Sequence, residues 1–295
     1  MNPIAPSPSA PIGVFDSGIG GLSVLRALQA EMPCERFVYL ADSAHAPYGE
    51  RGNAFVLARS QAIAAHLLQA HAIKALVVAC NTATAAAVQA LRARHPQLIV
   101  VGVEPALKPA CALTRTGHVG VMATRGTLAS GKFAQLLQRL HGQARITVQA
   151  CDGLADALEH ILAAGQTPAA STLEVLCARS TRAMGLFGIE ADAIDTLVLG
   201  CTHYVFAHDV LQALVGPGVR LLDTGEPVAR HTRHLLAQAR RLAMPGQTSV
   251  LELRTTGDAA LLQAASARWL AGPQALAKSI DIGIDSFGPL GRGLG

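Results

Sequence analysis

Charged and aromatic residues are both scarce in this chain of 295 residues. Asp, Glu, Lys and Arg make up 15% of it, Phe, Trp and Tyr 4%, and the formal net charge is +4. A nucleic-acid-binding domain usually carries a basic stripe with interleaved aromatic side chains. Here the arginines are scattered, apart from Arg240 and Arg241. The sequence therefore predicts no nucleic-acid partner.

Long hydrophobic runs are also missing, although 51% of the residues are hydrophobic. An uninterrupted apolar segment must reach about 20 residues to cross a bilayer, and the sequence contains none of that length. The first residues, MNPIAPSPSAP, lack the basic start and apolar block of a signal peptide and resemble a flexible leader. We therefore expect no membrane span and a cytoplasmic location.

The cysteines lack the spacing of a metal site or a redox pair. There are six of them, Cys34, Cys80, Cys111, Cys151, Cys177 and Cys201. They form no Cys-x-x-Cys pair and no Cys/His set with zinc-ligand spacing, so we expect no metal site and free thiols in a reducing cytosol. All except Cys80 and Cys201 fall in predicted turns or helices, and we interpret these four as structural.

A short apolar run that ends in cysteine occurs twice, and it organises the chain. The segment AIKALVVAC, residues 72–80, aligns with AIDTLVLGC, residues 193–201. Each run is typical of a buried parallel strand, and ligands of α/β sheets bind at the carboxyl ends of such strands. Cys80 and Cys201 are therefore predicted where chemistry usually occurs. A helix is predicted directly after Cys80, and its N-terminus is expected to lower the pKa of that thiol.

Apolar strands alternate with helical segments along most of the chain, which predicts an α/β fold. The segment Gly120–Met122 repeats the pattern of Gly13–Phe15, so a second lobe restarts there. Two polar loops follow the first two strands: Asp16-Ser17 with its GIGG turn, and residues 41–50. The turn is not a GxGxxG motif, and the acid at the strand end argues against a phosphate there. Taken alone, each loop could also be a plain surface turn.

Matched thiols in two lobes would suit chemistry on two faces of one ligand. If the lobes face each other across a cleft, one of Cys80 and Cys201 could remove an α-proton while the other donates a proton to the opposite face. A thiol suits this role because its reference pKa, about 8.5, can be brought near neutrality by modest environmental shifts. Asp16 could assist Cys80 as a proton acceptor, and His203 could assist Cys201. Such a pair of opposed bases is what stereoinversion at an acidic carbon requires.

Six motifs together closely resemble the glutamate racemase family. They are FDSGIGGLSVL (15–25), YLADSAHAPYGER (39–51), VVACNTATA (77–85), GVEPALKPA (102–110), GVMATRGTLASG (120–131) and VLGCTHY (198–204). The match runs in order from about Ile12 to Gly272. The resemblance implies a racemase that needs no cofactor, interconverts L- and D-glutamate and supplies D-glutamate for peptidoglycan. It also implies a homodimer, and two similar three-layer α/β lobes with mainly parallel sheets, related by pseudo-twofold symmetry around an active-site cleft.

The resemblance also implies roles for individual residues. Cys80 and Cys201 match the two acid/base residues of the family. The substrate-binding pairs would be Asp16–Ser17, Tyr48–Gly49, Asn81–Thr82 and Thr202–His203. Further polar positions of the family site are matched by Asp42, Glu159 and His203, and its hydroxyl-bearing loop by Thr124 and Thr127. Val205 and Asp152 stand where the family commonly has proline, which bears on loop shape more than on chemistry.

The order of the predicted elements and the resemblance give the same domain organisation. A flexible leader covers residues 1–11. The first lobe is discontinuous and consists of residues 12–103 plus 226–273, and the second lobe consists of residues 104–225. Residues 274–295 form a C-terminal tail, within which SIDIGIDSF has strand-like alternation.

Three other functions stay open at this point. A racemase for aspartate or another amino acid of the superfamily would differ in pocket volume, which the sequence does not show. A thiol hydrolase or redox protein would use one nucleophilic cysteine and would leave the second, matched cysteine unexplained. A binding protein built on the same two lobes would have no use for either Cys80 or Cys201 as an acid or base.

Overall fold

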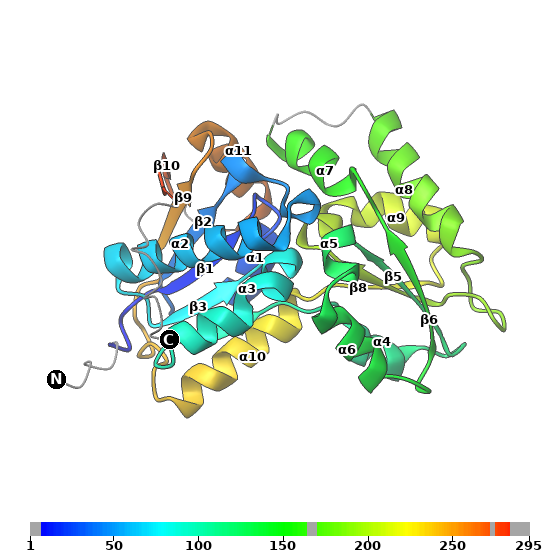
Figure 1. Ribbon diagram of the computed structural model, residues 1–295, viewed down its shortest axis with the longest axis horizontal. Helices are drawn as coiled ribbons and strands as arrows, with labels where there is room; N and C mark the ends of the chain where they lie inside the picture. Colours follow the sequence, from blue (N-terminus) through cyan, green and yellow to red (C-terminus); the bar gives the residue numbers. More distant parts are fainter. Residues whose placement is uncertain (1–6, 164–169, 272–274, 284–295) are drawn as a thin grey trace, which may run out of the picture.

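The computed structural model describes residues 7–163, 170–271 and 275–283, and it confirms the predicted α/β class. Two parallel sheets lie side by side in Figure 1, with helices on both faces of each. Residues 1–6 of the predicted leader, and residues 274 and 284–295 of the predicted tail, lie outside the described residues. Within the described ranges, no helix is both long and apolar enough to cross a bilayer.

The first sheet has six parallel strands in the order β10-β9-β2-β1-β3-β4. The strands are β1 Ile12–Asp16, β2 Phe37–Ala41, β3 Ala75–Val78, β4 Ile99–Gly102, β9 Leu251–Thr255 and β10 Ala277–Ser279. One face packs on α1 Leu22–Glu31, α10 Gly225–Gln238 and α11 Ala259–Trp269, and the other on α2 Asn53–His71 and α3 Asn81–Arg94. Because both faces are covered, β1, β2 and β3 are buried along their whole length, as their continuous apolar runs predict.

The C-terminal part of the chain completes this first sheet. Strand β9 pairs with β2, and β10 pairs with β9. The segment predicted as a tail therefore supplies the edge strand, and Ile282 beyond it is buried against the helix α2 side of the sheet. The sequence gives little signal for this strand, because β10 has three residues and is largely exposed. The residue boundaries of the two lobes stay a prediction.

The second sheet has four parallel strands in the order β6-β5-β7-β8. The strands are β5 His118–Ala123, β6 Arg145–Ala150, β7 Thr196–Gly200 and β8 Arg220–Leu222. Helices α4 Leu107–Leu113 and α6 Gly131–Arg139 pack on one face, and α7 Leu154–Ala163, α8 Ala170–Met184 and α9 His208–Val215 on the other. The short turns that carry site residues are η1 Ser43–His45, η2 Tyr48–Glu50, α5 Arg125–Leu128 and η3 Thr202–Ala207.

The two sheets repeat the same strand order. The segment β2-β1-β3-β4 of the first sheet corresponds to β6-β5-β7-β8 of the second, and β9 and β10 are additions to the first. In this correspondence β3 and β7 occupy equivalent interior positions. Cys80 follows β3 and Cys201 follows β7, so the repeat read from the sequence places the two thiols at equivalent points of the two lobes.

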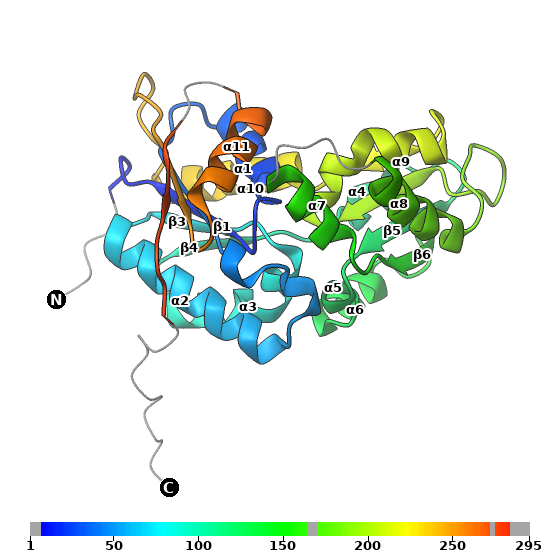
Figure 2. The ribbon, with the colours of Figure 1, turned by 90° about the horizontal axis from the view of Figure 1, so that it is seen from above.

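The lobes touch through several elements that flank the carboxyl ends of their strands. Helix α7 lies beside α11 in both views, and α5 contacts η2 and α3 (Figure 1, Figure 2). Phe206 of η3 packs against Trp269 of α11, with ring centroids 4.5 Å apart and ring planes tilted by 53°, and it contacts the hydrophobic clusters of both lobes. These contacts bury the region between the two cysteine-bearing strand ends.

Candidate active site

Cys80 is the N-cap residue of helix α3, as the apolar run followed by a helix predicts. Its Sγ accepts a hydrogen bond from the backbone N–H of Ala83 at 3.4 Å, and the thiol lies 3.8 Å from Ser17 Oγ. The side chain is only 6% exposed. Burial raises the pKa of the Cys80 thiol well above its ordinary value, and the charge of Asp16 raises it further. The helix N-terminus does lower this pKa through the Ala83 N–H, as expected, but burial outweighs it and the net shift is upward.

Cys201 stands at the start of η3 and has a different neighbour. Its Sγ lies 3.8 Å from His203 Nδ1, and His203 Nε2 lies 2.6 Å from Glu159 Oε2. Burial lowers the pKa of His203, but hydrogen bonds to Cys201 and Glu159 outweigh it, and the pKa is raised well above its ordinary value. Burial raises the pKa of Glu159, yet His203 holds it below the ordinary value overall. The pair is therefore an imidazolium beside a carboxylate, which places a buried proton donor next to Cys201.

Asp16, at the end of β1, is fully buried and lies between the two halves of the site. Its Oδ1 accepts from Ser17 N at 2.7 Å, and its Oδ2 accepts from Gly21 N at 2.5 Å and from Thr202 Oγ1 at 3.4 Å. Asp16 reaches Cys80 through Ser17, whose hydroxyl lies 3.4 Å from Asp16 Oδ1. Burial raises the pKa of Asp16 to about 6, although the charge of His203 works in the opposite direction. A carboxyl group with this pKa can exchange protons near neutral pH.

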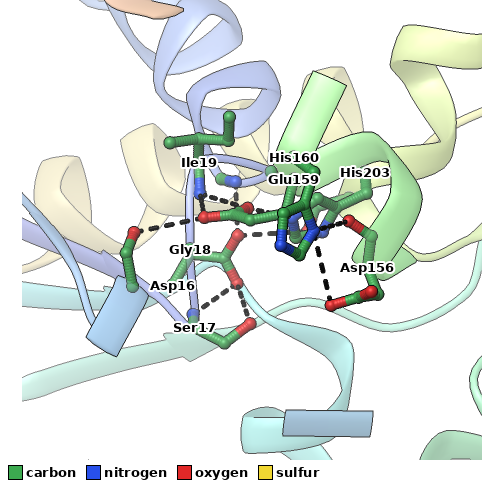
Figure 3. A network of polar contacts seen from close by, with 12 residues as sticks. Asp16, Ser17, Gly18, Ile19, Asp156, Glu159, His160 and His203 are labelled. Atoms are coloured by element: carbon green, nitrogen blue, oxygen red, sulfur yellow. Dashed lines mark hydrogen bonds and ion pairs between the residues drawn. The ribbon is translucent and has the colours of Figure 1, made fainter. Parts of the chain in front are cut away.

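Glu159 of α7 binds the glycine-rich turn that follows β1 (Figure 3). Its two carboxylate oxygens accept from Ile19 N at 2.9 and 3.2 Å, and Oε1 accepts from Ser43 Oγ at 3.1 Å. A Cβ added at Gly18 would lie 2.3 Å from Glu159 Oε2, and one at Gly20 would lie 2.3 Å from His203 Nδ1. The GIGG turn is thus needed for close approach of two charged side chains from the second lobe, which excludes the plain-turn interpretation.

Replacing Gly20 by alanine is expected to lower kcat/KM by roughly tenfold or more, because a catalytic group displaced by about 1 Å can cost up to 10²-fold. The new methyl group would push the His203 ring away from Cys201. Steady-state kinetics and the circular dichroism spectrum of the variant would measure the effect. Gly52→Ala is the matched control, since nothing lies within 4 Å of a Cβ at that glycine. Equal loss in both variants would show that the close approach is unimportant.

Hydroxyl groups from the two lobes meet at the other end of the site. Thr82 Oγ1 lies 3.1 Å from Thr124 Oγ1, which donates to Thr127 Oγ1 at 2.9 Å. Gly49 packs against Thr124, where an added Cβ would lie 2.9 Å from Thr124 Cβ. Asn81 is 4% exposed, and among the described residues neither its Oδ1 nor its Nδ2 has a hydrogen-bond partner. A buried amide without partners leaves one acceptor and one donor available to a ligand.

Asp42 and Tyr48 lie behind this end of the site and are bound to each other. The Tyr48 hydroxyl donates to Asp42 Oδ2 at 2.5 Å, so this hydroxyl is engaged inside the protein. Two further buried polar groups were not predicted from the sequence: Arg59, which is paired with Asp42, and Tyr39, whose hydroxyl donates to Gly18 O at 2.7 Å. Both stand within long apolar segments, and nothing local distinguishes them from ordinary helix or strand residues. Among the described residues, no set of three or more His, Cys, Asp or Glu could hold a metal ion.

Comparison with known proteins gives one consistent family. The family model described as Asp/Glu/Hydantoin racemase matches residues 21–232. A glutamate racemase of Stutzerimonas stutzeri is 50% identical over 238 residues, which are 80% of this chain and 85% of that protein. A glutamate racemase of Ralstonia nicotianae is 47% identical over 281 residues, 95% of this chain and 96% of that one.

Solved structures agree with these sequence relatives. A glutamate racemase isoform from Bacillus anthracis superposes with a TM-score of 0.80 at 28% identity, over 92% of this chain and 98% of that one. Escherichia coli glutamate racemase, solved with L-glutamate and the activator UDP-MurNAc-ala, gives a TM-score of 0.77 at 30% identity, over 92% and 97% of the two chains. The similarity seen in the six motifs is thereby confirmed over nearly the whole length.

Proposed function

The chain belongs to the Asp/Glu/Hydantoin racemase family, and on that basis we propose that it interconverts L-glutamate and D-glutamate by proton transfer between two cysteines. The observation that carries the mechanism is the pair of thiols at equivalent strand ends, each next to its own proton carrier. Cys80 is linked through Ser17 to Asp16, and Cys201 lies beside His203. A charge on Cys201 raises the pKa of the Cys80 thiol, which supports two thiols close to one ligand.

In the proposed reaction, one cysteine acts as a thiolate and takes the α-proton from one face of the bound amino acid. The C–H bond breaks, an S–H bond forms, and the electron pair stays on the α-carbon. The opposite cysteine then donates its thiol proton to the other face, which forms the new C–H bond and leaves that cysteine as the thiolate. The reverse reaction exchanges the two roles. The Cys80 thiolate must be formed by a neighbour, because burial raises the pKa of this thiol.

The carbanion needs hydrogen bonds and positive charge around it, since no other stabilisation follows from these side chains. The unpaired Asn81 amide and the hydroxyls of Thr82 and Thr202 are proposed to hold the α-carboxylate and α-amino group. The imidazolium of His203, kept charged by Glu159, adds a positive charge close to Cys201. A thiol hydrolase would need only one of these arrangements, so the second matched set favours racemisation.

Three finer statements belong to the same proposal. The enzyme is proposed to act in the cytoplasm, to supply D-glutamate for peptidoglycan synthesis, and to work as a homodimer. The family resemblance of the six motifs supports the supply of D-glutamate and the homodimer. Size-exclusion chromatography with light scattering would test the homodimer, because a monomeric mass at assay concentration would contradict it.

The test of the activity is the circular dichroism of L-glutamate with purified enzyme in D2O, without added cofactor. Decay of the optical signal to zero, together with deuterium at the α-carbon, is the expected result. L-Aspartate under the same conditions is the comparison, because the two substrates differ by one methylene group. Racemisation of aspartate alone would keep the mechanism and overturn the substrate. No deuterium uptake from either amino acid would overturn the enzyme assignment.

A further inference from the structure

Arg59 of helix α2 is one of the largest fully buried side chains of the described protein, with 1% of its surface exposed. A guanidinium group is rarely buried unless every donor is matched. Here Nε donates to Asp42 Oδ2 at 2.9 Å and Nη2 donates to Asp42 Oδ1 at 2.6 Å. Nη1 donates to the backbone carbonyl of Ile282 at 2.5 Å. One side chain thus joins the loop after β2 to the chain segment after β10.

The Asp42 carboxylate is fully used by these and other donors. Oδ1 also accepts from Thr256 Oγ1 at 2.8 Å and lies 3.0 Å from His45 Nδ1, and Oδ2 accepts from the Tyr48 hydroxyl. With five contacts, Asp42 has no oxygen free for a substrate. Its function is therefore to hold the loop on which Tyr48 and Gly49 stand.

The C-terminal part of the chain also contacts the loop at residues 41–50. Thr256, just after β9, donates to Asp42 and accepts from the backbone N–H of Ala44 at 3.2 Å. The backbone N–H of Thr256 donates to Ala41 O at 3.0 Å. Gly257 packs against Ser43, because a Cβ added at Gly257 would lie 3.0 Å from Ser43 Cβ. The loop at residues 41–50 is thereby fixed between helix α2 and three residues of the C-terminal part, Thr256, Gly257 and Ile282.

The far end of this loop is Gly49, which lies against Thr124 of the second lobe. A backbone shift at Asp42 would move Gly49 relative to Thr124 and Thr82, the hydroxyl cluster at one end of the site. Burial lowers the pKa of Arg59, but the hydrogen bonds and charge of Asp42 outweigh it, so the guanidinium stays charged throughout.

We propose that Arg59 and Thr256 are positioning residues for substrate binding, which clamp the loop at residues 41–50 through Asp42 and so fix Gly49 at the edge of the site. The proposal rests on the proposed function only in that the ligand is glutamate. The C-terminal segment is then part of the substrate-binding apparatus, although it is remote in sequence from every motif residue.

Two mild substitutions in the full-length protein test the clamp. Arg59→Lys keeps the charge but cannot bind both Asp42 oxygens and Ile282 O at once. Thr256→Val keeps the shape and removes the hydroxyl that bonds Asp42 and Ala44. Each is expected to raise the KM for glutamate by roughly tenfold, the usual effect of losing one hydrogen bond at a charged group, with kcat within about threefold.

Matched controls separate positioning from stability. Arg92→Lys removes a guanidinium–carbonyl contact to Val100 in the same lobe, and Thr232→Val removes a buried hydroxyl bond within α10. Both are expected to leave KM unchanged. A merely structural role for Arg59 and Thr256 would lower the melting temperature while leaving KM at the wild-type value, and that result would overturn the proposal.

Amide hydrogen exchange gives a readout that does not need activity. Peptides covering residues 42–50 are expected to exchange faster in Arg59→Lys and Thr256→Val than in the wild type or the two controls. Unchanged exchange there would refute the clamp even if KM rose. If the wild type failed to racemise glutamate while the exchange result held, the proposed function would fall and the clamp would stand.

Discussion

Replacing either Cys80 or Cys201 by alanine is expected to lower the racemisation of glutamate by about 10²–10⁴-fold, the usual contribution of a positioned acid or base. The loss should be similar for the two variants, because both thiols take part in every turnover. A reaction that used a single nucleophilic cysteine would lose its rate in one variant and keep it in the other. Polarimetry or circular dichroism starting from each pure enantiomer would measure both rates.

The two variants should differ in the enantiomer whose α-proton they still exchange. Each retains one thiol, which can remove the proton from one face and return deuterium to the same face without inversion. Cys80→Ala and Cys201→Ala are therefore expected to exchange opposite enantiomers in D2O, as seen by proton NMR. Cys111→Ala, at a half-buried cysteine of α4, is the control and should keep full activity. Exchange of the same enantiomer by both variants would contradict the two-face mechanism.

Asp16→Asn is expected to have the next largest effect, a loss of about 10²-fold in kcat/KM at pH 8, because it removes the carboxylate linked to Cys80 through Ser17. The wild-type rate should also fall below about pH 6, where Asp16 takes up a proton and can no longer accept one. The rate falls toward low pH because the ionised carboxylate is the active form, which predominates above the pKa of Asp16 and is lost below it. In the asparagine variant this acidic limb should disappear.

The pH profile of kcat/KM in a three-component buffer measures that limb. Protonation of Glu159 would give an acidic limb at lower pH than protonation of Asp16, because the pKa of Glu159 is held below its ordinary value. The two sources can therefore be distinguished. Asp156→Asn is the matched control, since this exposed carboxylate stands on the same helix as Glu159 and pairs with His160 (Figure 3). If the acidic limb persisted in Asp16→Asn, a group other than Asp16 would be its cause.

The parts of the site that the sequence predicted correctly depend on local pattern. An apolar run followed by cysteine places Cys80 and Cys201 at strand ends, and the repeated strand order follows from two similar segments. The pKa of Cys80 could not be predicted in this way, because the residues clustered around it are spread along the chain from Phe15 to Ile282. The function of the GIGG turn also depended on Glu159, which lies 140 residues beyond Ile19.

The contacts around Asp42 are still harder to predict from the sequence. Arg59 contacts Ile282 across 223 residues of chain, and Thr256 contacts Asp42 across 214. Neither contact leaves a periodicity or a turn signal in the sequence, since each consists of single side chains that meet only when the sheet is complete. Strand β10 ends at Ser279, where the alternating segment SIDIGIDSF begins, so the sequence indicated an extended segment here but not the bounds of the strand.

The fluorescence of Trp269 can report on movement between the two lobes. It is the one tryptophan in the chain, and its ring packs against Phe206 of the opposite lobe. Cys80, Cys201 and Asn81 are all buried, so a substrate reaches them only if the residues that cover them move. A movement that displaces η3 from α11 would change the surroundings of this single indole, and its emission can be followed in stopped flow on unlabelled protein. Comparing that relaxation rate with kcat would show whether substrate entry or proton transfer is the rate-limiting step.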